Sequence, residues 1–312
     1  MDCLTIGEPL MCFDSGDEPF DATQVVRKYA VGAESNVAIG LARLGRSVAY
    51  VGRVGRDNLG REIVRTLRGE GVDVSGLSAV DAGPTGLLLK EQPGAGHTEV
   101  TYHRAGSAGS TLSVADLPAR FSNVRRLHVT GITLVLSPTA RRAVLEAMRR
   151  AHADGCRVSL DANFRRKLAP ASTLVEAFEE AAALADEIIL GRGEAALCVG
   201  DDDDSRLEDY ARSLPAETVV LKGASGGSIG FSGGERIECA PVRVPVIDSV
   251  GAGDGFAAGL LHALLDGRSL PGALEVGGRV AARVIARHGD YQGLPYAQDL
   301  EIDSKSTRAV LR

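Results

Sequence analysis

VIDSVGAGDGFAAGL (residues 246–260) is the most informative stretch of this 312-residue chain. An apolar run over 244–247 leads into it and predicts a buried strand, and apolar residues recur at helical spacing from Phe256 to Leu265. Gly251 and Gly253 have no Cβ, so backbone N–H groups at this point can approach a ligand closely. The first turn of the expected helix adds unpaired N–H groups and the positive end of the helix dipole. The stretch therefore predicts a strand–loop–helix unit that binds an anion, and phosphate is the usual one.

The carboxylate of Asp254 distinguishes this loop from other phosphate-binding loops. A Walker-type loop carries Lys and then Ser or Thr at its end. A carboxylate beside bound phosphates repels them unless it has another task, such as accepting a proton from the attacking hydroxyl. The structural alternative is that Asp254 only complements the helix dipole. Residues 253–258 also fit the looser G-x-G-x-x-[GA] pattern of dinucleotide binding, but that pattern requires an acidic residue about 20 positions on, after a strand. A helical segment over 273–285 follows instead.

The residues DSVGAGDGF (248–256) resemble the DTxGAGDxF signature of the ribokinase, or pfkB, family of carbohydrate kinases, with Ser249 in place of the Thr. The resemblance implies phosphoryl transfer from ATP, with Mg²⁺, to a sugar hydroxyl. It implies that Asp254 is the catalytic base and that the backbone of Gly251, Ala252 and Gly253 forms the anion hole. It also implies that Asp248 binds a monovalent cation such as K⁺, as in many relatives.

A second group of residues is expected to bind the sugar. GAESNVA (32–38) resembles the family's GGxxxNxA motif, in which the glycines approach the substrate and the Asn donates to a hydroxyl. This resemblance implies Gly32, Ala33 and Asn36 as substrate-binding residues. Standing alone, Asn36 would be read as a residue that caps a helix.

Tyr102 and Arg104 end an expected strand, and residues two apart on a strand face the same side. Arginine binds a carboxylate through two parallel hydrogen bonds, so this pair suits a substrate with hydroxyls and an acidic group. An exposed cross-strand pair is the structural alternative. YHRAGSA (102–108) resembles the 2-keto-3-deoxygluconate kinase branch of the family, in which this Tyr and Arg hold the sugar acid.

Further motifs are expected on the phosphate side. DANFRRKL (161–168) resembles the family's DxNxRxxLW stretch without its Trp, and a surface basic cluster is the alternative. GRGE (191–194) stands in place of the NxxE motif and implies that Glu194 contacts magnesium through water. LKGASGGS (221–228) resembles the KxGxxG nucleotide loop. The residues implied for ATP are Asn163, Lys222, Gly223, Ser225, Gly227, Ser228, Gly251 and Gly253, and the substrate set gains Arg165 and Asp290.

The composition argues against several other classes of function. A formal net charge of −6 without a basic block argues against a nucleic-acid-binding protein. Five scattered cysteines without a CxxC pair suit a reducing compartment and argue against a disulfide framework or a zinc site. No apolar run approaches the ~18 residues of a membrane span, so the expectation is a cytoplasmic protein without a membrane partner.

Expected strands alternate with expected helices along most of the chain, as in strand 127–131 before helix 138–153. This alternation predicts an α/β fold with a mostly parallel sheet covered by helices on both faces, in a single domain over 1–312. The resemblance implies the three-layer ribokinase-like form of that fold. Residues 12–31 and 86–104, the latter an expected hairpin around Pro93–Gly96, interrupt the alternation and are expected to form a small β lid. Such a lid covers the sugar in the family and often supplies the dimer contact, which implies a homo-oligomer.

Together these features predict a kinase that phosphorylates 2-keto-3-deoxygluconate or a close sugar acid with Mg-ATP. A neutral-sugar kinase of the same family, of the fructokinase or ribokinase type, is the nearest alternative. A sugar-binding protein without activity and a nicotinamide-dependent oxidoreductase are the alternatives from other classes.

Overall fold

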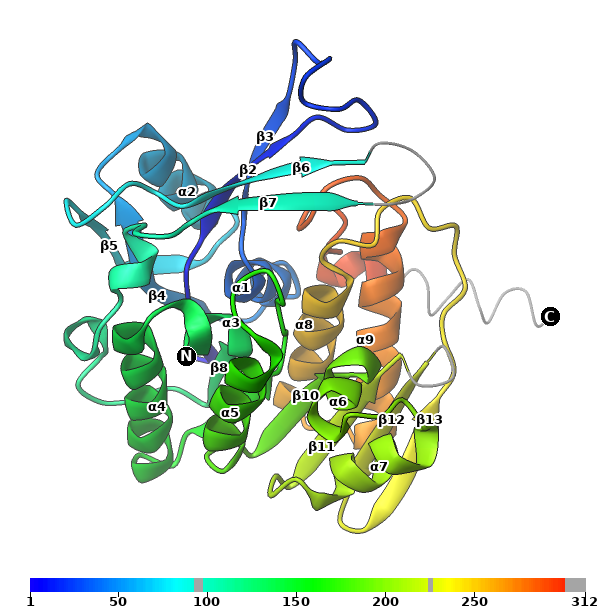
Figure 1. Cartoon of the computed structure of the whole chain (residues 1–312). Helices are drawn as coiled ribbons and strands as arrows, with labels where there is room; N and C mark the ends of the chain where they lie inside the picture. The colour runs from blue at the N-terminus through cyan, green and yellow to red at the C-terminus, as the bar shows by residue number, and fades with distance from the viewer. Residues whose placement is uncertain (93–97, 224–226, 301–312) are drawn as a thin grey trace.

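The computed structural model describes residues 1–92, 98–223 and 227–300, and within these residues nine strands form one large sheet (Figure 1). All neighbouring pairs from β11 to β5 are parallel, whereas β12 pairs antiparallel with both of its neighbours. The order is β13 (Glu235–Cys239), β12 (Ser228–Ser232), β11 (Thr218–Lys222), β10 (Glu187–Gly191), β9 (Arg157–Asp161), β8 (Arg126–Thr130), β1 (Cys3–Ile6), β4 (Val48–Gly55) and β5 (Asp73–Val80).

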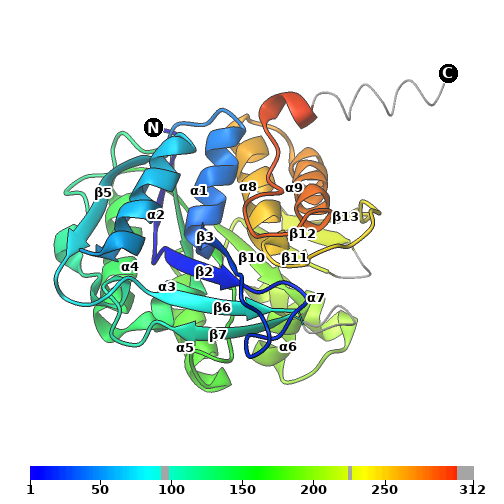
Figure 2. The same cartoon turned by 90° about the horizontal axis from the view of Figure 1, so that it is seen from above.

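Helices cover both faces of this sheet, as parallel strands joined by right-handed crossovers require (Figure 2). One face packs against α1 (Ala33–Arg43), α2 (Asn58–Gly69), α8 (Ala252–Leu265) and α9 (Leu270–Ile285). The other packs against α3 (Gly131–Leu136), α4 (Pro138–Ala153), α5 (Ala171–Ala182), α6 (Arg192–Val199) and α7 (Asp204–Ser213). The predicted α/β layering is confirmed. Among the described residues no helix combines the length and apolarity needed to cross a bilayer.

A second sheet, here called the lid sheet, lies across one end of the molecule above α1 and α8 (Figure 1). Its strands run in the order β3 (Arg27–Val31), β2 (Leu10–Asp14), β6 (Leu87–Glu91) and β7 (Glu99–His103). β6 and β7 pair antiparallel as the predicted hairpin requires, although its expected turn lies mostly at 93–97, outside the described residues. The segments 12–31 and 86–104 thus contribute to one sheet, which β2 joins by pairing parallel with β6.

The expected strand before the glycine loop is absent. Residues 241–247 belong to no strand, and Val246 and Ile247 are 66% and 47% exposed. Pro245 has no N–H to donate to a neighbouring strand, and an apolar run forms a strand only where a neighbouring strand pairs with it. Instead, the N–H groups of Ile247 and Asp248 donate to the carbonyl of Ile285, where α9 ends, at 2.8 and 3.2 Å.

Among the elements of the described residues that were not predicted are β5 and α3. β5 is an edge strand with exposed polar residues at several positions, so it lacks the apolar run that marks a buried strand. α3 has only six residues, directly after β8, too few to show a helical period.

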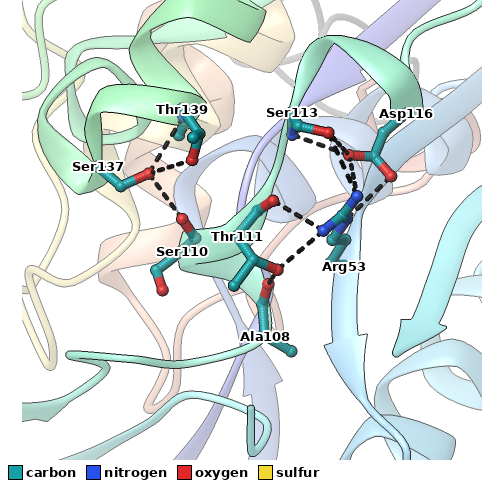
Figure 3. A network of polar contacts seen from close by, with 9 residues as sticks. Arg53, Ala108, Ser110, Thr111, Ser113, Asp116, Ser137 and Thr139 are labelled. Atoms are coloured by element: carbon teal, nitrogen blue, oxygen red, sulfur yellow. Dashed lines mark hydrogen bonds and ion pairs between the residues drawn. The ribbon is translucent and has the colours of Figure 1, made fainter. Parts of the chain in front are cut away.

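The chain that leaves the lid sheet after β7 is anchored on the large sheet by a polar network (Figure 3). Arg53 of β4 forms an ion pair with Asp116 at 2.8 Å and donates to the carbonyl of Thr111 at 2.8 Å. Ser137, which caps α4, donates to the carbonyl of Ser110 at 2.6 Å. This network gives Arg53 a structural role, and Asp57 has one as the N-cap of α2.

Candidate active site

Helix α8 begins at Ala252, directly after Gly251, whose backbone has a φ of 78°. A Cβ at Gly251 would lie 2.5 Å from Oδ1 of Asp290 and 2.6 Å from its carbonyl oxygen, so both conformation and space require glycine. The carboxylate of Asp254 lies in the first turn of this helix, and the residue is only 6% exposed. The predicted junction of glycine loop and helix is therefore present.

Asp254 belongs to a buried cluster with Asn36, Asn163 and Asp290. Nδ2 of Asn36 donates to Oδ2 of Asp254 at 2.7 Å and to Oδ1 of Asp290 at 2.9 Å. Nδ2 of Asn163 donates to Oδ1 of Asp254 at 3.2 Å, from a backbone with a φ of 41° that Asn tolerates better than most residues. Oδ1 of Asn36 is buried with no partner among the described residues, so it can accept a hydrogen bond from a bound hydroxyl.

The environment of the two carboxyl groups raises both pKa values. Burial raises the pKa of Asp254 to about 6, although the hydrogen bond from Asn36 and the charge of Arg165 act in the opposite direction. Burial, followed by the nearby charge of Asp254, raises the pKa of Asp290 to about 7. A carboxylate with a pKa of about 6 is mostly ionised at neutral pH and is a stronger base than an exposed one. Asp254 is therefore suited to accepting a proton.

A cavity beneath the lid sheet, here called the lid cavity, opens onto one side of Asp254. Lid strands supply part of its wall and the starts of α1 and α8 supply another part. Its lining includes Gly32, Ala33, Asn36, Tyr102, Arg104, Arg165, Asp254 and Asp290. The structure thus brings together all the residues that the sequence assigns to the substrate.

A second cavity, here called the loop cavity, is also lined by Asp254. It is lined by Asn163, Arg165, Glu194, Lys222 and residues 249–254. A mostly apolar cavity, here called the apolar cavity, shares Lys222, Ala252 and Gly253 with it and extends to Gly223, Gly227, Ser228, Val242, Phe256 and Ile285. Every residue that the sequence assigns to ATP therefore lines one of the two cavities, except Ser225, which lies outside the described residues.

The two predicted arginines of the lid cavity have different surroundings. Arg104 is buried and bound to Glu8, with its Nη2 and Nε at 2.5 and 2.7 Å from Oε2. Its guanidinium also lies 5.7 Å from the ring centre of Tyr102. Arg165 forms no ion pair within the described part of the chain, and its one hydrogen bond is a 3.4 Å contact with the carbonyl of Phe164. Arg165 is thus the more available of the two for an anionic ligand.

Charged groups gather at the ends of β9, β10 and β11, where Glu194 and Lys222 line the loop cavity. Nζ of Lys222 lies 2.9 and 3.1 Å from the two carboxylate oxygens of Asp161. Burial lowers the pKa of Lys222, but the charges of Asp161 and Glu194 outweigh it, and the net pKa is raised. Glu194 accepts hydrogen bonds from the N–H groups of Phe164 at 2.8 Å and Gly191 at 2.5 Å. The lysine therefore stays charged beside the glycine loop.

Asp248, which the resemblance implies for a monovalent cation, has three protein partners in the structure. Its carboxylate is buried and engaged by the N–H groups of Val250 and Gly289 and by the ammonium group of Lys90. The ammonium group of Lys90 thus places a positive charge beside this carboxylate.

Comparison with known proteins bears on the identity of this site. Residues 7–297 match the family described as pfkB family carbohydrate kinase. The chain belongs to the pfkB family. The kinase is 37% identical to the 2-dehydro-3-deoxygluconokinase of Bacillus subtilis (strain 168), over 99% of this chain and 97% of that protein. The predicted carbohydrate-kinase activity is therefore confirmed.

Solved structures agree with this membership. A PfkB protein from Polaromonas sp. JS666 superposes on the kinase with a TM-score of 0.86 at 34% identity, covering 96% of this chain and 99% of that one. Aminoimidazole riboside kinase from Salmonella enterica, solved with aminoimidazole riboside and an ATP analog, superposes with a TM-score of 0.85 at 26% identity, covering 97% and 99%. The predicted ribokinase-like fold is confirmed.

Several charged residues of this pfkB kinase site were missing from the prediction, among them Glu8, Lys90 and Asp161. Glu8 follows the first strand, and Asp161 begins the quoted motif at 161–168, so their positions at strand ends were a usable signal. Lys90 follows the apolar run 87–89, and lysines are ordinarily exposed, so nothing in the sequence indicated its burial. The sequence analysis also assigned no residue of α9 to the apolar cavity, because apolar residues of a helix are expected to pack against the core.

Proposed function

We propose that this pfkB kinase transfers the terminal phosphoryl group of ATP to a sugar acid, with 2-keto-3-deoxygluconate as substrate and its 6-phosphate as product. The observation that carries the proposal is that Asp254 lines both the lid cavity and the loop cavity. A carboxylate at that junction can accept the proton of a hydroxyl on one side while the phosphoryl group approaches from the other.

The glycine loop stabilises the transferring phosphoryl group in this proposal. Backbone N–H groups of Gly251, Ala252 and Gly253 would bind its oxygens, supported by the positive end of the α8 dipole. Lys222 adds a positive charge beside the glycine loop. Its Nζ is close to Gly253, since a Cβ placed on that glycine would lie only 3.4 Å from it. The adenine would occupy the apolar cavity, whose Val242, Phe256 and Ile285 suit the faces of a purine.

Magnesium would enter with ATP and neutralise phosphate charge. Glu194 fits a contact through water, because each carboxylate oxygen accepts one backbone N–H and keeps a further lone pair. The protein's part is to hold that carboxylate still, which the N–H groups of Phe164 and Gly191 do.

Selection for a sugar acid rests on the arginines of the lid cavity. Arg165 would bind the carboxylate of the substrate, with Arg104 and Tyr102 beside it. Glu8 reduces the net charge at Arg104 and fixes its orientation. Asn36, with its free buried oxygen, would accept a hydrogen bond from a substrate hydroxyl, while Gly32 and Ala33 let the backbone approach the sugar.

A neutral sugar is the second candidate class of substrate. The observation that favours it is the similarity to aminoimidazole riboside kinase, because a riboside carries no acid group. Measuring ADP release across 2-keto-3-deoxygluconate, gluconate, fructose and ribose separates the two classes. The largest kcat/KM is expected with the keto-deoxy acid. A preference for fructose or ribose would contradict the acid proposal. If none of the sugars gave ADP release, a sugar-binding protein without activity would be favoured.

Replacing Arg165 with Met should raise KM for the sugar acid by roughly 10- to 100-fold, the usual worth of charged hydrogen bonds. The KM for neutral sugars should change much less, because they lack the anionic partner. Arg166 is exposed in the same loop, so Arg166→Met is the matched control and should behave like the wild type. Equal losses for acidic and neutral sugars would remove the case for acid recognition by Arg165.

The pH dependence of kcat/KM should show an acid limb with a midpoint near the raised pKa of Asp254, about 6. The sign follows from the role of the group, because a general base is inactive once protonated and activity falls as pH drops through its pKa. Asp290→Asn should leave this limb near pH 6, because Asp290, with a pKa of about 7, is largely protonated where Asp254 titrates. A direct product assay between about pH 4.5 and 8 measures both effects. A profile that stays flat throughout would contradict the assignment.

We also propose that the kinase forms a homo-oligomer through the lid sheet. Static light scattering would test this, and a monomer at working concentration would contradict it.

A further inference from the structure

The carboxylate of Asp248 precedes the glycine loop, and the protein engages both of its oxygens. The residue is 2% exposed. Its Oδ1 accepts the N–H of Val250 at 3.1 Å, and its Oδ2 accepts the N–H of Gly289 at 3.2 Å together with a hydrogen bond from Lys90. These contacts use both oxygens, and they include one full positive charge.

Lys90 reaches this carboxylate from β6 of the lid sheet. The residue is also 2% exposed, and its Nζ lies 3.8 Å from Oδ2 of Asp14 on β2. Asp14 is held in turn by the N–H of Gly16 and the hydroxyl of Tyr29, each at 2.8 Å. A lysine is almost never so deeply buried unless its charge is paired, and two buried carboxylates supply the pairing here.

These residues do not fit a dissociable monovalent cation at Asp248. Such a cation needs several oxygen lone pairs directed at it, and three donors leave Asp248 one, on Oδ1. A second positive charge placed beside the ammonium group would be repelled strongly, because little water is present to screen it. The sequence-based expectation of a K⁺ site therefore conflicts with the side chain that fills this position.

We propose that Lys90 is the permanent cation of this site and makes the kinase independent of alkali ions. This inference rests on the proposed phosphoryl-transfer site and deepens it. The N–H groups that bind Asp248 belong to Val250 and Gly289, which directly precede Gly251 and Asp290. Lys90 is thus a positioning residue that connects the lid sheet to the glycine loop and to the loop carrying Asp290.

The first test uses the unmodified protein in potassium, sodium and tetramethylammonium chloride at equal ionic strength. With whichever sugar is phosphorylated best, kcat should agree within about twofold among the three salts. The unfolding temperature, which requires no substrate, should also be the same, because an ion that binds only the folded state would raise it. A kcat about fivefold or more higher in potassium, or a rise in unfolding temperature specific to potassium, would overturn the proposal.

The second test replaces Lys90 with Ala and uses Lys28→Ala as the matched control. Lys28 lies on β3 of the same lid sheet, but it is partly exposed and pairs with Glu62. Lys90→Ala should lower kcat by roughly tenfold or more while changing KM for the sugar much less, and Lys28→Ala should leave both unchanged. Potassium or ethylammonium ions should restore part of the lost kcat, since either can enter the space of the missing ammonium group.

Two results with Lys90→Ala would contradict the positioning role. One is an unchanged kcat. The other is a higher KM for the sugar with normal kcat, which would make Lys90 a substrate ligand. If this variant does not fold, the salt comparison on the unmodified protein still decides the question. Failure of the sugar-acid proposal would show separately, as absence of ADP release with acids while another sugar supports the salt comparison.

Discussion

Replacing Asp254 with Asn is expected to lower kcat by roughly 10²-fold or more, the usual scale for loss of a general base. The amide has nearly the same size but cannot accept the proton of the attacking hydroxyl. Sugar and nucleotide should still bind, because their cavities keep their walls. Initial rates of ADP release give kcat, and calorimetric titration with an ATP analogue and with the sugar gives the two affinities.

Asp266→Asn is the matched control for this variant. Asp266 follows the last residue of the same helix, is largely exposed and pairs with Arg46 at 2.8 Å. It should keep normal turnover.

A second readout for Asp254→Asn comes from stability. Burial raises the pKa of Asp254, so its ionisation destabilises the fold as pH rises through about 6. Asp254→Asn should therefore unfold at the same or a higher temperature than the wild type at pH 8. Near-normal turnover in Asp254→Asn would refute the role of this carboxylate.

Replacing Gly251 with Ala is expected to lower kcat by about 10²-fold, comparable to the loss of one donor in an oxyanion hole. Its φ of 78° disfavours a side chain, and the new Cβ would lie 2.5 Å from Asp290. The loop must therefore shift, which displaces the N–H groups proposed to bind the phosphoryl oxygens. Steady-state kinetics and thermal unfolding measured on the same preparation separate the catalytic loss from the loss of stability.

Gly45→Ala is the control that isolates backbone strain. Gly45 has a φ of 84°, and a Cβ there would meet nothing within 4 Å. It should lose stability by about 1–2 kcal/mol, as a left-handed non-glycine residue does, while its kcat stays normal. If Gly251→Ala lost stability to the same extent but kept its kcat, the glycine loop would not be the anion-binding element.

Much of the fold was predictable because its strands and helices carry regular apolar patterns. The helix expected over 138–153 is α4, and the strand expected over 157–161 is β9. The predictions of strands failed where the apolar pattern of the sequence did not match the burial of the residues. Residues 244–247 are apolar but exposed, so they form no strand, whereas the polar edge strand β5 pairs with β4 despite its weak pattern.

The candidate site was predictable where a motif carries the chemistry within a few residues. The loop 251–254 and the pair Tyr102 and Arg104 are of this kind. Gly251 and Asp254 of the loop line the lid cavity together with the pair. Partnerships between distant segments left no such local signal. Lys90 lies 158 positions from Asp248 and Arg104 lies 96 from Glu8, so only the folded chain shows that each cation has a carboxylate partner.

The most direct measurement is a crystal structure of the kinase with 2-keto-3-deoxygluconate and a non-hydrolysable ATP analogue. The reacting hydroxyl should lie within about 3.2 Å of a carboxylate oxygen of Asp254, in line with the terminal phosphate. The acid group of the sugar should contact Arg165. A bound sugar whose hydroxyls all lie beyond the reach of Asp254, or a terminal phosphate outside the loop cavity, would contradict the account.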